Sequence, residues 1–309
     1  MYKVAFVNGG AGRMVCSIPA LEKFILNNPE NYIVTEGGLD FVWGNKILQD
    51  RTFDSNSKGL FENIIKNGEI ISVEPYRVHD YYNQKCSIAQ AVDKILNGSY
   101  ESIEKYKVKL VANKEEEITG VAVTSEAKKV HGKKKTILIQ PFGRSVLNDE
   151  NMKTTYDHGS RSMENDFYLK LAKEIRTKYN LISMSEFQIP GDEYSMNPKN
   201  LTLRKWAAII SQVDYFVGCD SVGQHFAYGY DKPGTVICGS TFPINVSYTN
   251  HFNIIEKKGF ERRYDPIRIC EFGSYEAARL NDMAMSFDAA ETKDVINKIM
   301  SHIKLKIGE

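Results

Sequence analysis

Short runs of apolar residues alternate along the chain with longer stretches in which apolar residues recur every three or four positions. Residues 4–7 form one such run, and Val15 opens a stretch of the second kind that ends near Asn27. Runs without a polar face are typical of buried parallel strands, whereas recurrence every three or four residues indicates an amphipathic helix. The pattern predicts further strands at 32–35, 69–73, 136–139, 181–184, 215–217 and 235–238, and further helices at 87–96, 166–179, 203–213, from about 223, and 289–303.

This alternation occurs as two series and predicts an α/β fold with two parallel sheets, each covered by helices on both faces. Between the series, residues 100–135 carry many charges and few large apolar side chains, which predicts a solvated linker. We therefore expect a Rossmann-like N-terminal domain over residues 1–130 and a Rossmann-like C-terminal domain over residues 131–309. Whether the last helix packs back on the first domain is left open.

Composition and charge narrow the classes of function. Lys+Arg 40 and Asp+Glu 39 give a net charge of +1, so no overall charge attracts the chain to nucleic acid or to an anionic membrane. No apolar stretch approaches the ~18 residues that span a bilayer, and the first residues are typical of a strand rather than a signal peptide. The five cysteines form no CxxC pair, which argues against structural zinc or a disulfide framework. We expect a cytoplasmic protein without stable membrane insertion.

The first strand leads into a glycine-rich turn, in which Gly10 and Gly12 precede Arg13. Such a turn lets the backbone approach a ligand beside a helix N-terminus, which favours negative charge. The turn matches neither GxGxxG nor a P-loop, so a tight connection without a ligand is the other interpretation.

The segment from Asp220 to Thr241 holds the densest candidate chemistry. Asp220 and Ser221 stand where a buried strand gives way to a helix, and His225 lies within the first turns of that helix. Ligands of open α/β sheets bind at such carboxyl ends of strands. A carboxylate, hydroxyls, helix N–H groups and an imidazole facing one crevice suit a sugar and a diphosphate. The alternatives are that Asp220 and Ser221 only cap the helix and that His225 is a buried core residue.

This segment resembles the pattern of glycosyltransferase family 9, the bacterial lipopolysaccharide heptosyltransferases, which have the GT-B fold. The residues in register with that pattern are Asp220, Ser221, His225, Ala227, Lys232, Pro233, Gly239 and Thr241. Pro19–Leu21 and the strand and loop at 137–145 match other parts of the family. The resemblance implies two Rossmann-like domains facing a central cleft, a nucleotide-sugar donor, inversion at the sugar and no metal. It also implies donor-binding roles for Arg144, Ser145, Arg161, Asp220, Ser221, Gly223, His225 and Thr241.

Two departures from the family pattern matter for the chemistry. The family glycine after D-[ST] is Val222 here, and Gly223 follows one place later. The acidic residue of the first turn, which acts as general base in the family, is Arg13, and an arginine stays protonated. We therefore expect Gly10, Gly12 and Arg13 to contact the acceptor or a phosphate.

A replacement base is expected in the N-terminal domain, on a loop at the carboxyl end of a strand. Glu36 and Asp40 directly follow the second predicted strand and are the first candidates. His79 and Asp80, after the third strand, are the second choice. Ordinary exposed loop charge is the alternative for each of them. The chain has no DxD motif, and Asp220 has no second carboxylate nearby in the sequence, so we predict no cofactor and no metal.

These observations predict a metal-independent glycosyltransferase that moves a sugar from a nucleotide sugar to a hydroxyl, most simply on a glycan. Arg13, Arg144 and Arg161 would concentrate positive charge where a diphosphate lies. A hydroxymethylated DNA base is an alternative acceptor, served by Arg13 and the lysines between 114 and 135. A catalytically inactive nucleotide-sugar-binding protein is the second alternative. A dehydrogenase is disfavoured because GxGxxG is absent. The sugar, the nucleotide and the oligomeric state do not follow from the sequence.

Overall fold

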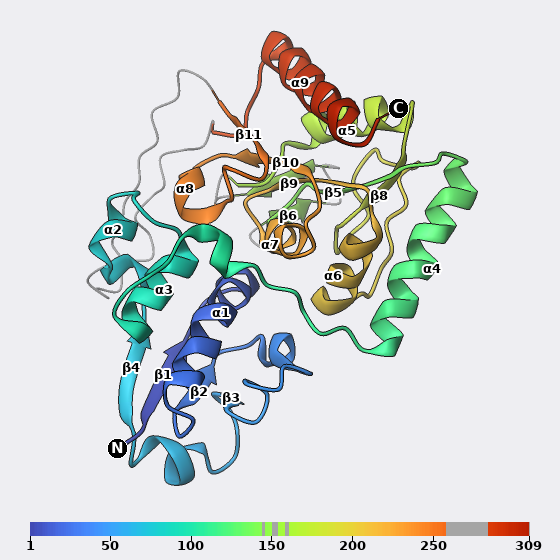
Figure 1. The fold of residues 1–309 in the computed structure, drawn as a ribbon. Coiled ribbons are helices and arrows are strands. Elements are labelled where there is room, and N and C mark those ends of the chain that lie inside the picture. The colour runs from blue at the N-terminus through green and yellow to red at the C-terminus, as the bar shows by residue number, and fades with distance from the viewer. Residues whose placement is uncertain (144–145, 150–153, 158–160, 258–283, 309) are drawn as a thin grey trace. The chain divides into compact units, whose positions relative to one another are not determined.

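The computed structural model describes residues 1–143, 146–149, 154–157, 161–257 and 284–308. These residues divide into two compact units, of which the first spans Met1–Asn113 and the second begins at Lys114 (Figure 1). The prediction of two parallel-sheet α/β domains is confirmed. The second unit begins at Lys114 rather than at the expected residue 131, because residues 114–130 belong to it.

The first unit is built on a four-stranded parallel sheet in the order β3-β2-β1-β4. The strands are β1 (Lys3–Val7), β2 (Tyr32–Thr35), β3 (Thr52–Asp54) and β4 (Glu69–Val73). Helices α1 (Ala11–Asn27) and α3 (Ile88–Asn97) pack together, while Val4 and Val34 pack against Leu60 and Ile64. The strand order reverses between β1 and β4, so the crevice beyond their carboxyl ends is the topological switch point of this sheet.

Short helical elements complete the first unit. They are η1 (Leu39–Val42), η2 (Phe61–Ile65), η3 (Pro75–Arg77), α2 (His79–Tyr82) and η4 (Ile103–Tyr106). Helix α1 begins four residues before the predicted Val15, and Pro19 lies inside it.

The second unit holds a five-stranded parallel sheet in the order β11-β10-β9-β5-β8. The strands are β5 (Thr136–Gln140), β8 (Asn180–Ser183), β9 (Tyr215–Cys219), β10 (Gly234–Cys238) and β11 (Asn253–Glu256). The helices are α4 (Lys114–His131), α5 (Asn165–Arg176), α6 (Leu203–Gln212), α7 (Val222–Gly229), α8 (Pro243–Val246) and α9 (Ala289–Ile307), and β6 (Val146–Asp149) pairs antiparallel with β7 (Thr154–Asp157). The order reverses between β5 and β9, which makes their carboxyl ends the switch point of this sheet.

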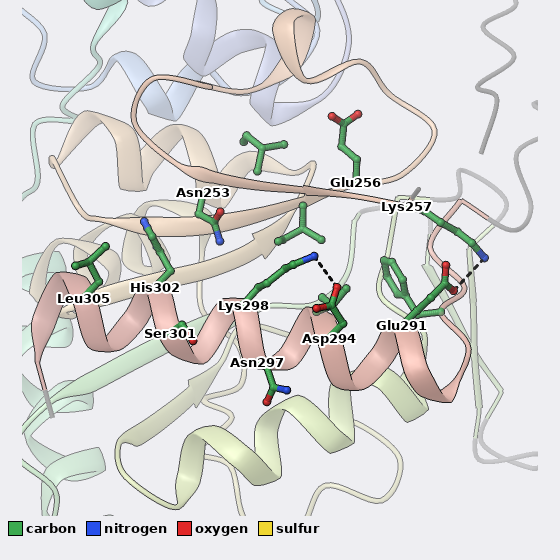
Figure 2. Close-up of a pocket in the computed structure, with 14 residues that line it drawn as sticks. Asn253, Glu256, Lys257, Glu291, Asp294, Asn297, Lys298, Ser301, His302 and Leu305 are labelled. Atoms are coloured by element: carbon green, nitrogen blue, oxygen red, sulfur yellow. Dashed lines mark hydrogen bonds and ion pairs between the residues drawn. The ribbon is translucent and has the colours of Figure 1, made fainter. Parts of the chain in front are cut away.

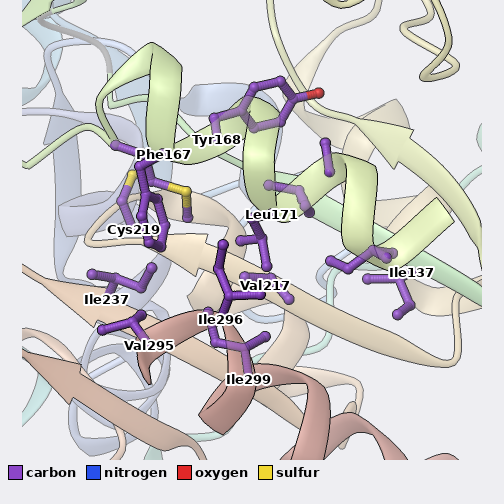
Figure 3. Close-up of a cluster of buried hydrophobic side chains, with 14 of the residues drawn as sticks. Ile137, Phe167, Tyr168, Leu171, Val217, Cys219, Ile237, Val295, Ile296 and Ile299 are labelled. Atoms are coloured by element: carbon purple, nitrogen blue, oxygen red, sulfur yellow. The ribbon is translucent and has the colours of Figure 1, made fainter. Parts of the chain in front are cut away.

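A buried apolar cluster joins one face of the second sheet to helices α5 and α9 (Figure 3). Ile137 and Val217 project from the sheet, Leu171 comes from α5 and Ile299 from α9, and all four are fully buried. Side chains alternate along a strand, so Phe216 points to the opposite face, where it approaches Gly223 of α7. The C-terminal helix therefore packs on the second unit.

The charged stretch before residue 131 contains helix α4, so the prediction of a solvated linker over residues 100–135 is wrong for this part. Helix α4 packs on α6 with small residues, and a Cβ at Gly120 would lie 2.6 Å from the Ala208 carbonyl oxygen. Glu116 and Arg204 form a buried ion pair across the contact, at 2.6 and 2.9 Å. The face of α4 that contacts α6 is therefore formed by small residues and an ion pair, while Ile118 and Val121 of the same helix are exposed.

The cysteines of the described residues are all buried: Cys16, Cys86, Cys219 and Cys238. Burial raises the pKa of the Cys86 thiol to about 12 and that of Cys219 further, with the Asp220 carboxylate as the next cause for Cys219. These side chains are neutral thiols in the core. Cys270 lies outside the described residues.

Candidate active site

The switch point of the second sheet brings together residues far apart in the sequence. Gln140 ends β5 opposite Gly218 of β9, and Asp220 and Ser221 follow directly after β9. Strand β10 pairs Ile237 with Cys219, so its following loop reaches the same edge. Asp220 and Ser221 thus lie at the carboxyl end of a parallel strand, where the sequence places them.

Gln140 links the end of β5 to the first turn of helix α7. Its Oε1 accepts a hydrogen bond from the backbone N–H of Gly223 at 2.8 Å, and its Nε2 donates to Ser221 Oγ at 2.9 Å. Ser221 is the N-cap residue, yet its hydroxyl makes no capping bond to the helix. A Cβ at Gly223 would lie 2.3 Å from Gln140 Oε1, which is why glycine stands at this place rather than at Val222.

Asp220 is 6% exposed and lies against the same turn. Its Oδ1 accepts a hydrogen bond from Gln224 Nε2 at 3.1 Å. Since Gln224 is itself fully buried, this contact fixes the carboxylate at the edge of the sheet rather than at the helix surface. Asp220 is therefore a fixed hydrogen-bond acceptor at the switch point.

Arg161 supplies a cation beside the same edge. A Cβ at Gly143, just after β5, would lie 4.0 Å from the Arg161 guanidinium, and the electrostatic field of Arg161 acts on Cys219 at the end of β9. The loop is held by Ser162, whose backbone N–H donates to Asp157 Oδ2 at 2.9 Å and whose hydroxyl accepts from the N–H of Gly143. The other predicted donor residues of this region, Arg144 and Ser145, lie outside the described residues.

His225 is buried on helix α7 and is neutral near pH 7. Complete burial lowers the pKa of its imidazole to about 4. Its Nδ1 forms a hydrogen bond with the Tyr248 hydroxyl at 3.0 Å, and the Tyr248 ring stacks on Tyr228 with centroids 3.6 Å apart. His225 can thus act through hydrogen bonding or packing, but it carries no charge toward a diphosphate.

Three buried polar atoms belong to this part of the unit and have no hydrogen-bond partner among the described residues: Arg161 Nε, Gln224 Oε1 and Thr241 Oγ1. Arg161 lies beside the end of β5, Gln224 contacts Asp220, and Thr241 is on the loop after β10. Buried polar groups are nearly always satisfied, by protein, water or ligand. A donor, an acceptor and a hydroxyl that can serve as either suit a ligand that carries both hydroxyl and anionic groups.

The switch point of the first sheet holds an ion pair. Arg13, in the first turn of α1, donates to Asn8 Oδ1 at 2.7 Å and contacts Glu74 Oε2 at 3.3 Å. Glu74 follows β4 directly and is 7% exposed. Gly10 is the N-cap of α1, Gly12 lies in its first turn, and the Arg13 side chain lies against Gly9. Glu74 is absent from the sequence-based candidates, although its position just after a predicted strand was the signal that would have found it.

The structure places the four bases predicted from the sequence on the loop after β2, in η1 and in α2. Glu36 is exposed just after β2, and Asp40 is half-buried in η1. His79 is exposed at the start of α2, with its Nδ1 3.6 Å from Asp80. Asp80 accepts a hydrogen bond from the Tyr100 hydroxyl at 2.9 Å, which lowers the pKa of that carboxyl.

Within the described residues, no group of three or more His, Cys, Asp or Glu side chains is arranged to hold a metal ion. The helices of this same part of the chain include none that is both long and apolar enough to cross a membrane.

A groove of about 740 Å³ lies elsewhere in the second unit, between edge strand β11 and helix α9 (Figure 2). Four of its charged groups form two ion pairs: Lys298 contacts Asp294 at 2.5 Å and Lys257 contacts Glu291 at 3.7 Å. None of the predicted donor residues is among the described residues that line it. We therefore place the candidate donor site at the switch point of the second sheet rather than in this groove.

No family model matches the sequence, and no curated protein matches it. The fold is similar to that of several solved structures. A family 9 glycosyl transferase of Veillonella parvula has a TM-score of 0.62 at 12% identity, with 98% of this chain and 97% of that chain covered. The iron-containing dodecameric glycosyltransferase TibC of enterotoxigenic E. coli has a TM-score of 0.59 at 11% identity, covering 100% of this chain and 78% of that one.

The E. coli ADP-heptose lipopolysaccharide heptosyltransferase II is similar to the same degree, with a TM-score of 0.59 at 10% identity over 98% of this chain and 99% of that chain. Identity this low establishes a shared fold. The resemblance drawn from residues 220–241 is thus matched by the three-dimensional structure, and the chain has the two-domain GT-B fold of the family 9 glycosyltransferases.

Proposed function

We propose that the protein is a glycosyltransferase that takes a sugar from a nucleotide-sugar donor and transfers it to a hydroxyl of a saccharide. The observation that carries this proposal is the group of buried polar atoms on Arg161, Gln224 and Thr241, which have no hydrogen-bond partner among the described residues and lie at this edge of the second sheet. Nucleotides bind at such a crevice in open α/β sheets. The solved relatives include TibC in complex with ADP-D-β-D-heptose, so an adenosine diphosphate sugar is the first donor to test.

The second unit would hold the donor through complementary groups. Arg161 would offer N–H groups to the diphosphate, and the N-terminal turn of α7 adds a partial positive charge. Asp220 would accept hydrogen bonds from hydroxyls of the donor, because its carboxylate is fixed by Gln224. Ser221, Gly223 and Thr241 complete the predicted set. Arg144 and Ser145 stay predictions from the resemblance.

Transfer would proceed by displacement at the anomeric carbon with inversion. The acceptor oxygen forms a bond to that carbon while the bond to the diphosphate oxygen breaks, and the electron pair leaves with the nucleoside diphosphate. Arg161 and the helix N-terminus would stabilise the charge that develops on the leaving group. We propose that no metal takes part in this step.

A saccharide acceptor is favoured over a hydroxymethylated DNA base. Arg13, which the DNA hypothesis uses as a cation, is paired with Glu74. Helix α4 carries Glu115 and Glu117 in its first turn and Lys128 and Lys129 in its last turn, so it offers a basic end rather than a continuous basic face. A neutral saccharide needs no such face, and its binding would respond little to salt, whereas DNA binding would weaken steeply. The buried thiols agree with the cytoplasmic location that we propose.

A two-step experiment tests the proposal. Thermal unfolding is followed with ADP, ADP-heptose, UDP-glucose and GDP-mannose, because a ligand that binds only the native state raises the melting temperature. The donor that binds is then incubated with saccharide acceptors, and release of the nucleoside diphosphate is measured. Binding without hydrolysis or transfer to any acceptor would support the inactive binding protein instead. No stabilisation by any nucleotide or nucleotide sugar would reject both.

A further inference from the structure

Resting on the proposed function, we infer that Glu74 is the general base of the reaction and that Arg13 positions it. Attack by a hydroxyl on the anomeric carbon releases a proton, so a proton acceptor must lie beside the attacking oxygen. Arg13 cannot serve, because its guanidinium remains protonated. The inference assigns this step to the carboxylate that Arg13 contacts.

The position of Glu74 is the first argument. It directly follows β4, and β4 neighbours β1 at the point where the strand order of the first sheet reverses. The loop that follows β1, with Asn8, Gly9 and Gly10 exposed, lies at the same edge. A Cβ built on Gly10 meets no atom within 4 Å, so the space beside this loop is open to an acceptor.

The fixed orientation of Glu74 is the second argument. Its carboxylate is 9% exposed and lies 3.3 Å from Arg13 Nη1, and the same nitrogen donates a hydrogen bond to Asn8 Oδ1 at 2.7 Å. Its Oε1 also accepts the backbone N–H of Tyr76 at 3.4 Å. A carboxylate has about four acceptor positions, so each oxygen keeps capacity for a hydroxyl. A base held in one orientation needs no reorganisation when the acceptor binds.

The carboxylates predicted from the sequence do not combine this position with low exposure. Glu36 is near the same edge but exposed, and Asp80 lies in α2, beyond η3, where it accepts a hydrogen bond from the Tyr100 hydroxyl. Asp40 lies in η1, the short helix that follows β2 in the chain.

The step balances as a proton transfer coupled to displacement. The acceptor O–H bond breaks, its proton goes to a Glu74 oxygen, and the acceptor oxygen forms the new bond to the anomeric carbon. The bond from that carbon to the diphosphate breaks with its electrons on the nucleoside diphosphate. Glu74 then releases the proton to solvent.

The test compares Glu74→Gln, Glu74→Asp and Glu74→Ala with wild type, using ADP-heptose as donor and water or a saccharide as acceptor. We expect Glu74→Gln to reduce ADP release at least 100-fold while the thermal shift caused by ADP stays unchanged. Glu74→Asp should keep part of the rate, and sodium formate should restore activity to Glu74→Ala by supplying the missing carboxylate. A purely structural role would not give rescue by formate.

The matched control is Glu69→Gln, which removes an exposed carboxylate at the opposite end of the same strand and should leave the rate unchanged. Glu36→Gln and Asp40→Asn are measured alongside. The inference is overturned if Glu74→Gln turns over within threefold of wild type, if formate fails to rescue a folded Glu74→Ala, or if Glu36→Gln or Asp40→Asn alone abolishes turnover. Failure of the wild type to bind or turn over any donor would instead reject the proposed function.

Discussion

The side-chain oxygen of Gln140 accepts the backbone N–H of Gly223 at 2.8 Å, joining the end of β5 to the first turn of α7. This contact leaves no room for a side chain at Gly223, where a Cβ would lie 2.3 Å from the Gln140 oxygen. This hydrogen bond therefore fixes the N-terminal turn of α7, which follows β9, against the carboxyl end of β5.

Gly223→Ala is expected to lower the free energy of unfolding by about 1–3 kcal/mol, because the new methyl group displaces Gln140 from a close-packed position. Urea unfolding measures the change. Gly143→Ala, at the same edge, is the matched control, since a Cβ there meets only ordinary contacts at 3.8 Å or more. Equal stabilities of the two variants would contradict the close approach.

Asp220→Ala is expected to weaken donor binding or turnover tenfold or more, which corresponds to about 1.4 kcal/mol. Arg161→Ala should have a comparable effect on donor affinity, because it removes a cation from the diphosphate. Donor affinity and kcat/KM are the measurements. Asp166→Ala and Lys170→Ala, both exposed on α5, are the controls. Wild-type kinetics in Asp220→Ala and Arg161→Ala would show that the site lies elsewhere.

Because His225 is buried as a neutral imidazole, we expect the folded protein to lose stability in acid. Burial lowers the pKa of its imidazole from 6.5 in an unfolded chain to about 4, so between these values the unfolded chain binds more protons. This contribution is fully present above pH 6.5 and is lost as the pH falls toward 4, on the order of 3 kcal/mol in all. His131 and His302, whose pKa values burial also lowers, act in the same direction.

Urea unfolding at pH 7, 6, 5 and 4 measures the acid effect in wild type and His225→Gln. The variant should lose less stability than wild type over this range. His79→Gln, which replaces an exposed imidazole, should follow the wild-type curve. Parallel curves for wild type and His225→Gln would mean that His225 is not buried as a neutral group.

Arg204→Met should destabilise the second unit by about 3–5 kcal/mol, because it leaves the buried Glu116 carboxylate without its cation. Adding Glu116→Leu should restore much of this loss, since no buried charge then remains. Lys205→Met, which breaks an ion pair with the exposed Glu115, should cost less than about 1 kcal/mol. The melting temperatures of the four proteins decide the matter, and a double variant as unstable as Arg204→Met would reject the explanation.

Chelation tests the proposed metal independence. Transferase activity after dialysis against EDTA is expected to equal that of the untreated protein, and added Mg²⁺ or Mn²⁺ should not raise it. A loss of rate that a divalent ion restores would refute this part of the proposal.

The sequence predicted the central elements because they obey simple periodicities. Wholly apolar strands such as 136–139 and amphipathic helices such as 203–213 are found within a few residues of the expected bounds. Strands β3 and β11 were missed because they are short and only partly buried, so they lack the continuous apolar run that revealed β2, which is as short as β11. Helix α4 was missed because its contact face consists of small residues and a buried ion pair, which look like a solvated surface in one dimension.

Only those site residues that directly follow a predicted strand could be inferred from the sequence. Asp220 and Ser221 follow a recognisable strand, so their place at the sheet edge could be inferred. Glu74 follows a strand in the same way, but its significance depends on the contact with Arg13, 61 positions away. Gln140 was likewise out of reach, since its role depends on pairing with a glycine 83 positions along the chain.

The burial of the cysteines makes the protein suited to site-directed labelling. Cys16, Cys86, Cys219 and Cys238 are all shielded from reagents in the folded state. In a Cys270→Ser background, a thiol introduced at exposed Leu26 of the first unit and another at exposed Leu305 of the second would react selectively. A fluorophore pair attached there would report any change of distance between the units when a nucleotide sugar binds, without alteration of the native core.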